Sequence, residues 1–194
     1  MLRRALIPLL LLAGCTATPG VDMGGVDMGG GGGIGDPLIA AATSAPSTFG
    51  NMGQYQGNPA GAARAIVQLE FLTNAYQTDP IWAPQANPIM VEQLQQAQAE
   101  MRQTLGIAQA APAQNVVDAL NAAAQQISAG NIQGAQLALS APGFTLGGAE
   151  TLRRLGNMQS TTLTSVAAAA VNQAAMMPNQ GMGNRPFGGG MRRR

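Results

Sequence analysis

The sequence predicts an all-α protein: a small antiparallel bundle of about five helices, flanked by a disordered Gly-rich N-terminal tether and a disordered Gly/Arg tail. Three observations support this fold class. Apolar residues in the middle of the chain recur at the 3.6-residue period of an amphipathic helix. The dipeptide Asn-Pro stands directly before two such runs. No stretch shows the alternation of apolar and polar residues that indicates a strand.

The two Asn-Pro pairs are helix start signals, because an Asn side chain can cap free N–H groups and Pro suits the first helical position. The run after Asn58-Pro59 ends at Thr78-Asp79-Pro80, and its apolar stripe is Ala62, Ile66, Leu69, Leu72 and Tyr76. The run after Asn87-Pro88 ends at Gly106, and its stripe is Met90, Leu94, Ala97, Met101 and Leu105.

Three further helices follow in the sequence. A third starts near Pro112 and stops at Gly130, with the stripe Val116, Leu120, Ala124 and Ile127. A short fourth is capped by Asn131 and carries Ile132, Ala135 and Leu139. The fifth segment runs from about Gly148 to Met177, with the stripe Leu152, Leu155, Gln159, Thr162, Val166, Ala170 and Gln173. This last stripe contains polar residues, and Ser160-Thr161-Thr162 could interrupt the helix.

The turn around Gly130 leaves a second architecture open. Two short Ala-rich helices joined by Ala-Gly-Asn resemble one unit of a tetratricopeptide-type array. The 34-residue repeat of that class does not recur, however, so a generic antiparallel bundle is favoured.

The helices define the domain organisation. Residues 1–14 are a predicted signal peptide, 15–57 a lipidated Cys and flexible tether, 58–177 the helical domain, and 178–194 an Arg-ended tail. The tether repeats Val-Asp-Met-Gly-Gly and continues in Gly as far as Gly33. Such sequence cannot bury enough apolar surface to offset the entropy lost on ordering.

The N-terminus has the layout of a secretory signal. Arg3 and Arg4 precede a short apolar run, Ala5 to Leu12, which is far below the ~20 residues that a membrane-spanning helix needs. The next residues, Leu12-Ala13-Gly14-Cys15, resemble the lipobox of bacterial lipoprotein precursors. The alternative is an ordinary signal peptide cut after Ala17, with a Cys present by chance. The resemblance covers about fifteen residues and does not identify the family of the mature domain.

The resemblance implies that Cys15 carries the lipid. In that class the thiol is joined to diacylglycerol, a peptidase cuts before the Cys, and further acylation such as palmitate holds the protein on a membrane more firmly than one chain would. Thr16 rather than Asp follows the Cys, which by the sorting habit of enteric lipoproteins implies the outer membrane, facing the periplasm. The partner implied is the membrane itself, through covalent lipid.

Composition removes most catalytic chemistry. The chain has no His and no Lys, and Cys15 is its only Cys. This excludes Ser-His-Asp and Cys-His catalysis, Schiff-base lysines, and His or Cys metal sites. The only candidates left for acid–base work are the carboxylates Glu92, Glu100, Asp118 and Glu150, which we interpret as solvated helix surface. We therefore expect no enzyme and no cofactor.

Methionine is the one soft metal ligand available, because thioethers can hold Cu(I). The candidates are Met23, Met28, Met176, Met177 and Met182. Copper-binding segments usually cluster their sulfurs more closely, so spacer and packing roles are favoured and Cu(I) binding is kept as the alternative function.

The tail is the most basic part of the chain. It holds four Arg and no acid, Arg185, Arg192, Arg193 and Arg194. These residues are candidates for contact with an anionic surface, such as anionic lipid, lipopolysaccharide phosphate or an acidic envelope protein, although a solvated tail with no partner is the favoured interpretation. The middle of the chain is close to neutral, which argues against nucleic-acid binding. The sequence does not indicate an oligomeric state.

Together these observations predict a membrane-anchored envelope lipoprotein. Its helical domain is expected to have a non-catalytic structural, assembly or accessory role.

Overall fold

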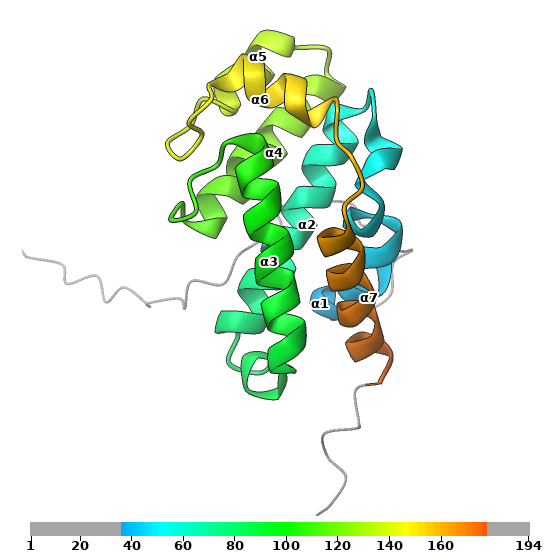
Figure 1. The fold of residues 1–194 in the computed structure, drawn as a ribbon. Coiled ribbons are helices and arrows are strands. Elements are labelled where there is room, and N and C mark those ends of the chain that lie inside the picture. Colours follow the sequence, from blue (N-terminus) through cyan, green and yellow to red (C-terminus); the bar gives the residue numbers. More distant parts are fainter. Residues whose placement is uncertain (1–35, 178–194) are drawn as a thin grey trace, which may run out of the picture.

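The computed structural model describes residues 36–177, and within this range the protein is all-α, as predicted (Figure 1). Seven α-helices and three short 3-10 helices make up the described part of the chain. The α-helices are α1 (Pro37–Ser44), α2 (Pro59–Thr78), α3 (Pro88–Leu105), α4 (Ala113–Ser128), α5 (Ile132–Ala138), α6 (Gly148–Leu155) and α7 (Thr162–Met176). The 3-10 helices are η1 (Ala45–Ser47), η2 (Phe49–Tyr55) and η3 (Ala83–Gln85).

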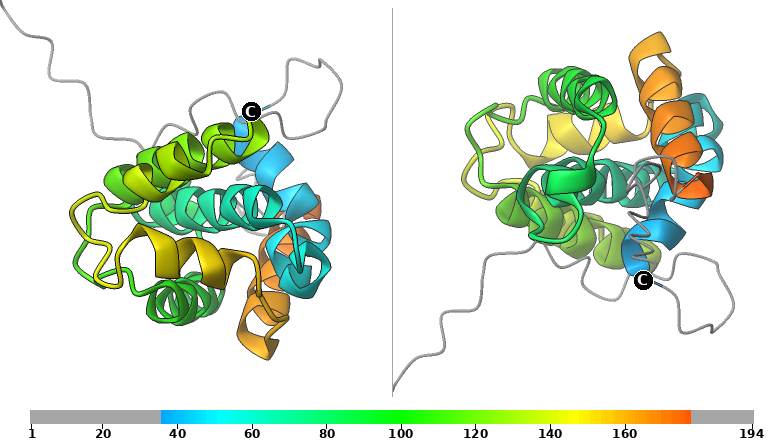
Figure 2. Two further views of the ribbon diagram at one scale, coloured as in Figure 1. Left: turned by 90° about the horizontal axis from the view of Figure 1, so that it is seen from above. Right: turned by 90° about the horizontal axis from the view of Figure 1, so that it is seen from below.

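Helix α2 forms the centre of the bundle. It packs against α1, α3, α4, α6 and η2, and Figure 2 shows it enclosed by the other helices. Its buried side chains lie on all sides of the helix, which is the pattern of a central helix rather than a surface one. The stripes predicted for the first two helices, α2 and α3, are buried throughout.

The predicted start signals act as caps. The side chain of Asn58 accepts a hydrogen bond from the Gly61 amide at 3.0 Å, and that of Asn87 accepts one from the Ile89 amide at 2.9 Å. Pro follows each Asn at the first helical position. These local bonds explain why both helix starts could be predicted to the residue.

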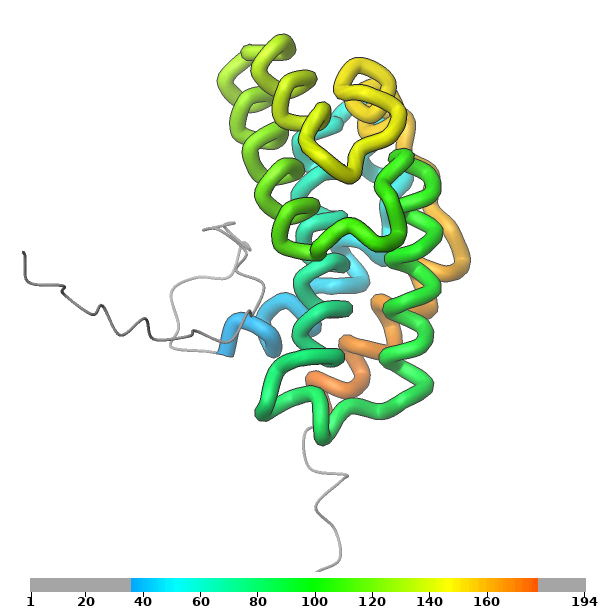
Figure 3. The backbone as a smooth tube through the Cα atoms, turned by 90° about the vertical axis from the view of Figure 1, so that its left-hand side faces the viewer, coloured from blue at the N-terminus to red at the C-terminus, as the bar shows by residue number. Residues whose placement is uncertain are grey.

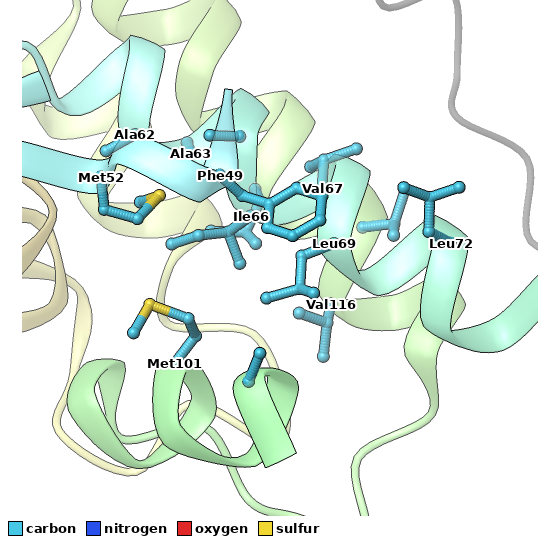
Figure 4. Close-up of a cluster of buried hydrophobic side chains, with 14 of the residues drawn as sticks. Phe49, Met52, Ala62, Ala63, Ile66, Val67, Leu69, Leu72, Met101 and Val116 are labelled. Carbon is cyan, nitrogen blue, oxygen red and sulfur yellow. The ribbon is translucent and has the colours of Figure 1, made fainter. Parts of the chain in front are cut away.

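The predicted boundary at residue 57 is wrong, because residues 36–57 belong to the folded domain. Helix α1, η1 and η2 bury apolar side chains of this segment, and Phe49 and Met52 have no exposed surface. Figure 4 shows both side chains in one cluster with Ile66 of α2. Polar contacts also hold the segment, since Asn172 of α7 donates to the Thr43 carbonyl at 2.8 Å.

The fifth predicted helix is two helices. The chain leaves helical geometry after Leu155 and resumes at Thr162, so the break lies where Ser160-Thr161-Thr162 indicated one. The predicted stripe is wrong for α7. The face that packs against α1, α3 and η2 is Thr164, Ala167, Ala168, Val171 and Ala175, whereas Val166 is 42% exposed. Alanine is common on every side of α7, so apolar spacing alone does not identify its buried face.

A buried ion pair joins α2 to α3. Arg102 meets Glu70 at 2.6 Å, and their side chains are 5% and 1% exposed. Gln98 also donates to this carboxylate at 2.6 Å, while Arg102 donates to the carbonyls of Gln109 and Ala111. Every polar group of the pair is thus engaged, and the network fixes the connection between α3 and α4.

Candidate binding groove

A groove of about 1070 Å³ lies on the surface of the described part of the chain. One wall is α7 and the other is the first half of α3; the connection between α2 and α3 and part of α1 close it. Its lining residues are Ile39, Tyr76, Trp82, Pro84, Gln85, Ala86, Asn87, Ile89, Met90, Gln93, Val166, Ala169, Ala170, Gln173, Ala174 and Met177. Helices α3 and α7 pack against each other, and Figure 1 shows them side by side in the lower half of the molecule.

Large apolar side chains are exposed along this groove. Ile89 on α3 is 66% exposed, Val166 on α7 is 42% exposed, and Met177 after α7 is 50% exposed. Ile81 and Met176, also largely exposed, flank the same end of the bundle. Single exposed apolar residues are ordinary on protein surfaces, but several gathered around one concavity mark a binding surface.

The floor of the groove is buried, and hydrogen bonds hold the connection beside it. Met90 and Tyr76 are buried there, and burial, with a contribution from the negative charge of Asp36, raises the pKa of Tyr76 to about 12. The carboxylate of Asp79 accepts from the amides of Ile81 and Trp82 at 2.8 and 3.1 Å, which fixes the start of the connection. The Trp82 indole in turn donates to Asp36 at 3.2 Å. The sole Trp of the chain is therefore held at the groove by both carboxylates.

The charges near the groove are acidic. The polar side chains of its lining are Gln and Asn amides and the Tyr76 hydroxyl, with no Arg among them, and Asp36 and Asp79 lie at the Trp82 edge. The Arg residues of the described range have partners elsewhere: Arg64 bonds Ser128, Arg102 pairs with Glu70, and both Arg153 and Arg154 pair with Glu150. An apolar ligand with a basic part would complement this groove.

The four carboxylates considered for acid–base chemistry have separate partners. Glu92 accepts from Gln96, Glu100 from Thr161 and Asp118 from Gln114. Hydrogen bonds from Arg153 and then Arg154 lower the pKa of Glu150 to about 2. A general acid needs the opposite shift, so Glu150 is suited to holding charge on the surface. Among residues 36–177 there is also no cluster of three or more His, Cys, Asp or Glu side chains.

The structure describes only some of the predicted site residues. Met176 and Met177 stand at the end of α7, both at least half exposed, and Met177 lines the groove together with Met90. Met90 and Met177 belong to the apolar part of the groove lining. The following lie outside the described residues: Cys15, Met23, Met28, Met182, Arg185, Arg192, Arg193 and Arg194.

The groove itself was not predicted from the sequence. Two features of the sequence are consistent with it. Trp82 lies in a connection between two prolines, an unusual place for the only Trp. The stripe Val166, Ala170 and Gln173 was assigned to the core, and the structure places all three side chains on the groove wall instead.

Comparisons with protein-family models, curated proteins and solved structures give no match. The described helices include none that combines the length and the apolar character needed to cross a bilayer.

Proposed function

We propose that this protein is a lipid-anchored, non-catalytic binding module of the bacterial cell envelope. In this proposal lipid on Cys15 holds it at the outer membrane, facing the periplasm, and the groove between α3 and α7 receives an apolar segment of an envelope partner. The observation that carries the proposal is the gathering of exposed apolar side chains around one groove in a protein that resembles a lipoprotein precursor.

The position of the groove supports a role near the membrane. Asp36 is the described residue nearest in sequence to Cys15, and it bonds Trp82 at the groove edge. The chain between them covers 21 positions, 15 to 36, so the groove edge cannot lie more than about 70 Å from the lipid at ~3.3 Å per residue. Figure 3 shows α1, the connection after α2 and the end of α7 toward the same end of the molecule.

The chemistry of the groove lining supports binding rather than catalysis. Its lining combines apolar side chains with a few amides, and its one ionisable side chain, Tyr76, is held protonated by its raised pKa. Such a surface can desolvate apolar side chains and offer a few hydrogen bonds. It suits an assembly or accessory role.

The anchor is tested by replacing Cys15. Wild type is expected to incorporate labelled palmitate and to fractionate with membranes in high salt. The variant Cys15→Ala should do neither. A variant that stays on membranes, together with a wild type that takes up no palmitate, would remove the lipoprotein part of the proposal.

The groove is tested by photo-cross-linking in intact cells. A photoreactive residue at position 89 replaces Ile89 on the groove wall, and the matched control replaces Leu137 of α5, which is 77% exposed outside the groove. We expect a discrete adduct from position 89 that Val166→Asp removes, and none from position 137. Equal adducts from both positions, or none from position 89, would contradict a groove that binds an envelope partner.

A further inference from the structure

The C-terminal segment of the chain begins at the groove. Met177 lines the groove, and the seventeen residues from Pro178 to Arg194 follow it directly. Any site on the groove wall is therefore covalently linked to this segment. A linked ligand has an effective concentration in the millimolar range for short connections, so even weak binding between segment and groove would be populated.

The composition of the segment complements the groove. Phe187 is its one aromatic residue, and Met182 and Met191 supply flexible apolar side chains. Its four Arg, 185 and 192–194, are accompanied by no acid, whereas the charged groups at the Trp82 edge of the groove are Asp36 and Asp79. Apolar residues thus match the lining, and basic residues match the acidic edge.

The segment is also long enough to return along the groove. From Val166 to Ala174, α7 rises about 12 Å at 1.5 Å per residue. Phe187 lies ten positions after Met177, and ten residues can span up to about 33 Å. The chain can therefore reverse direction after Met177 and still bring Phe187 to any point along the groove.

We propose that residues 178–194 are a resident occupant of the groove, with Phe187 as the apolar anchor and the terminal arginines beside Asp36 and Asp79. An external partner then has to displace this segment, so the segment lowers the apparent affinity of the groove for that partner. This inference uses the groove of the proposed function, but it depends neither on lipidation nor on the identity of the partner.

Trp82 is the reporter, because it lines the groove and is the only Trp. The full chain is purified with Cys15→Ala, so that no detergent fills the groove, and acrylamide quenching of Trp82 fluorescence is measured. Phe187→Ala is expected to make Trp82 more accessible to quencher, and Phe187→Leu should retain most of the protection. The control in the same segment, Gln180→Ala, should match the parent.

A double-mutant cycle tests whether Phe187 and the groove act together. Val166→Gln alters the groove wall at a half-exposed position and should raise quenching about as much as Phe187→Ala does. If the two side chains meet, the double variant is no more accessible than either single variant. A synthetic peptide of residues 178–194 should restore protection to the Phe187→Ala chain with a dissociation constant below about 1 mM, and more weakly in high salt.

Three results would overturn the inference. Quenching in Phe187→Ala could equal that of the parent, or the effects of Val166→Gln and Phe187→Ala could be additive. Protection could also depend on protein concentration, which would identify a second copy as the occupant. An envelope protein can still be cross-linked from position 89 when the tail does not occupy the groove, so failure of this inference is distinguishable from failure of the proposed function.

Discussion

Replacing Phe49 by Ala tests whether residues 36–57 are part of the folded domain. Phe49 has no exposed surface and packs in the same cluster as Met52 and Ile66 (Figure 4). Truncation of a fully buried Phe typically lowers the free energy of unfolding by about 3–5 kcal/mol, through lost transfer free energy and the cavity left behind. Since domains are typically stable by only about 5–15 kcal/mol, this loss would be a large fraction of the total.

The assay is urea unfolding of the full chain, followed by helical circular dichroism and by Trp82 fluorescence. Because Trp82 lies far along the chain from Phe49, a shift of both transitions together would show that the two regions unfold as one unit. The control Leu137→Ala removes an apolar side chain that is 77% exposed, and it should change the free energy of unfolding by less than about 0.5 kcal/mol. A loss below about 1 kcal/mol for Phe49→Ala would mean that the segment is a tether after all.

Three further predictions concern charged and ionisable groups. Arg102→Met should lower the free energy of unfolding by about 3–5 kcal/mol in urea titrations, because it strands the Glu70 carboxylate in the core, and adding Glu70→Leu should recover much of that loss. With the other tyrosine replaced by Phe, ultraviolet titration should place the pKa of Tyr76 at about 12, and Asp36→Asn should lower it. The stabilisation linked to neutral Tyr76 is complete below its unfolded pKa, about 10, and should be lost as the pH rises through 12. The pKa of Glu150 is lowered to about 2, so the pH dependence of its contribution to stability is reversed. That contribution is fully present above the unfolded pKa, about 4.3, and should be lost as the pH falls toward 2. Acid unfolding of Glu150→Gln should therefore depend less on pH in that range.

The features that sequence predicted well are those determined by neighbouring residues. The starts of α2 and α3 depend on an Asn side chain and the amides two or three residues later. The end of α3 depends on Gly106, whose φ of 68° few other residues adopt readily. Such signals act within one turn of chain, so they can be recognised without knowing what the helix packs against.

Residues 36–57 were predicted to be part of a flexible tether because they follow a Gly-rich run directly. The Gly-rich run ends at Gly35, and Leu38, Ala41, Ala42 and Ala45 then follow at the spacing of a helix face. A helix of eight residues has little stability of its own. Its stability comes from packing against α2 and α7, which are distant in sequence, so the neighbouring Gly residues were a poor guide to its state.

The error in α7 has a different cause, and it bears on function. The stripes of α2 and α3 contain only apolar residues or Tyr, and all of them are buried. The stripe predicted for α7 contained Thr162 and Gln173 among apolar residues, and its members Val166, Ala170 and Gln173 line the groove. A groove that binds an apolar segment must also be stable in water when no segment is bound. A helix face with both apolar and polar side chains meets both requirements. The polar residues in the stripe fit a helix with two different faces: one face builds the bundle, and the other lines the groove in which the proposed function places a partner.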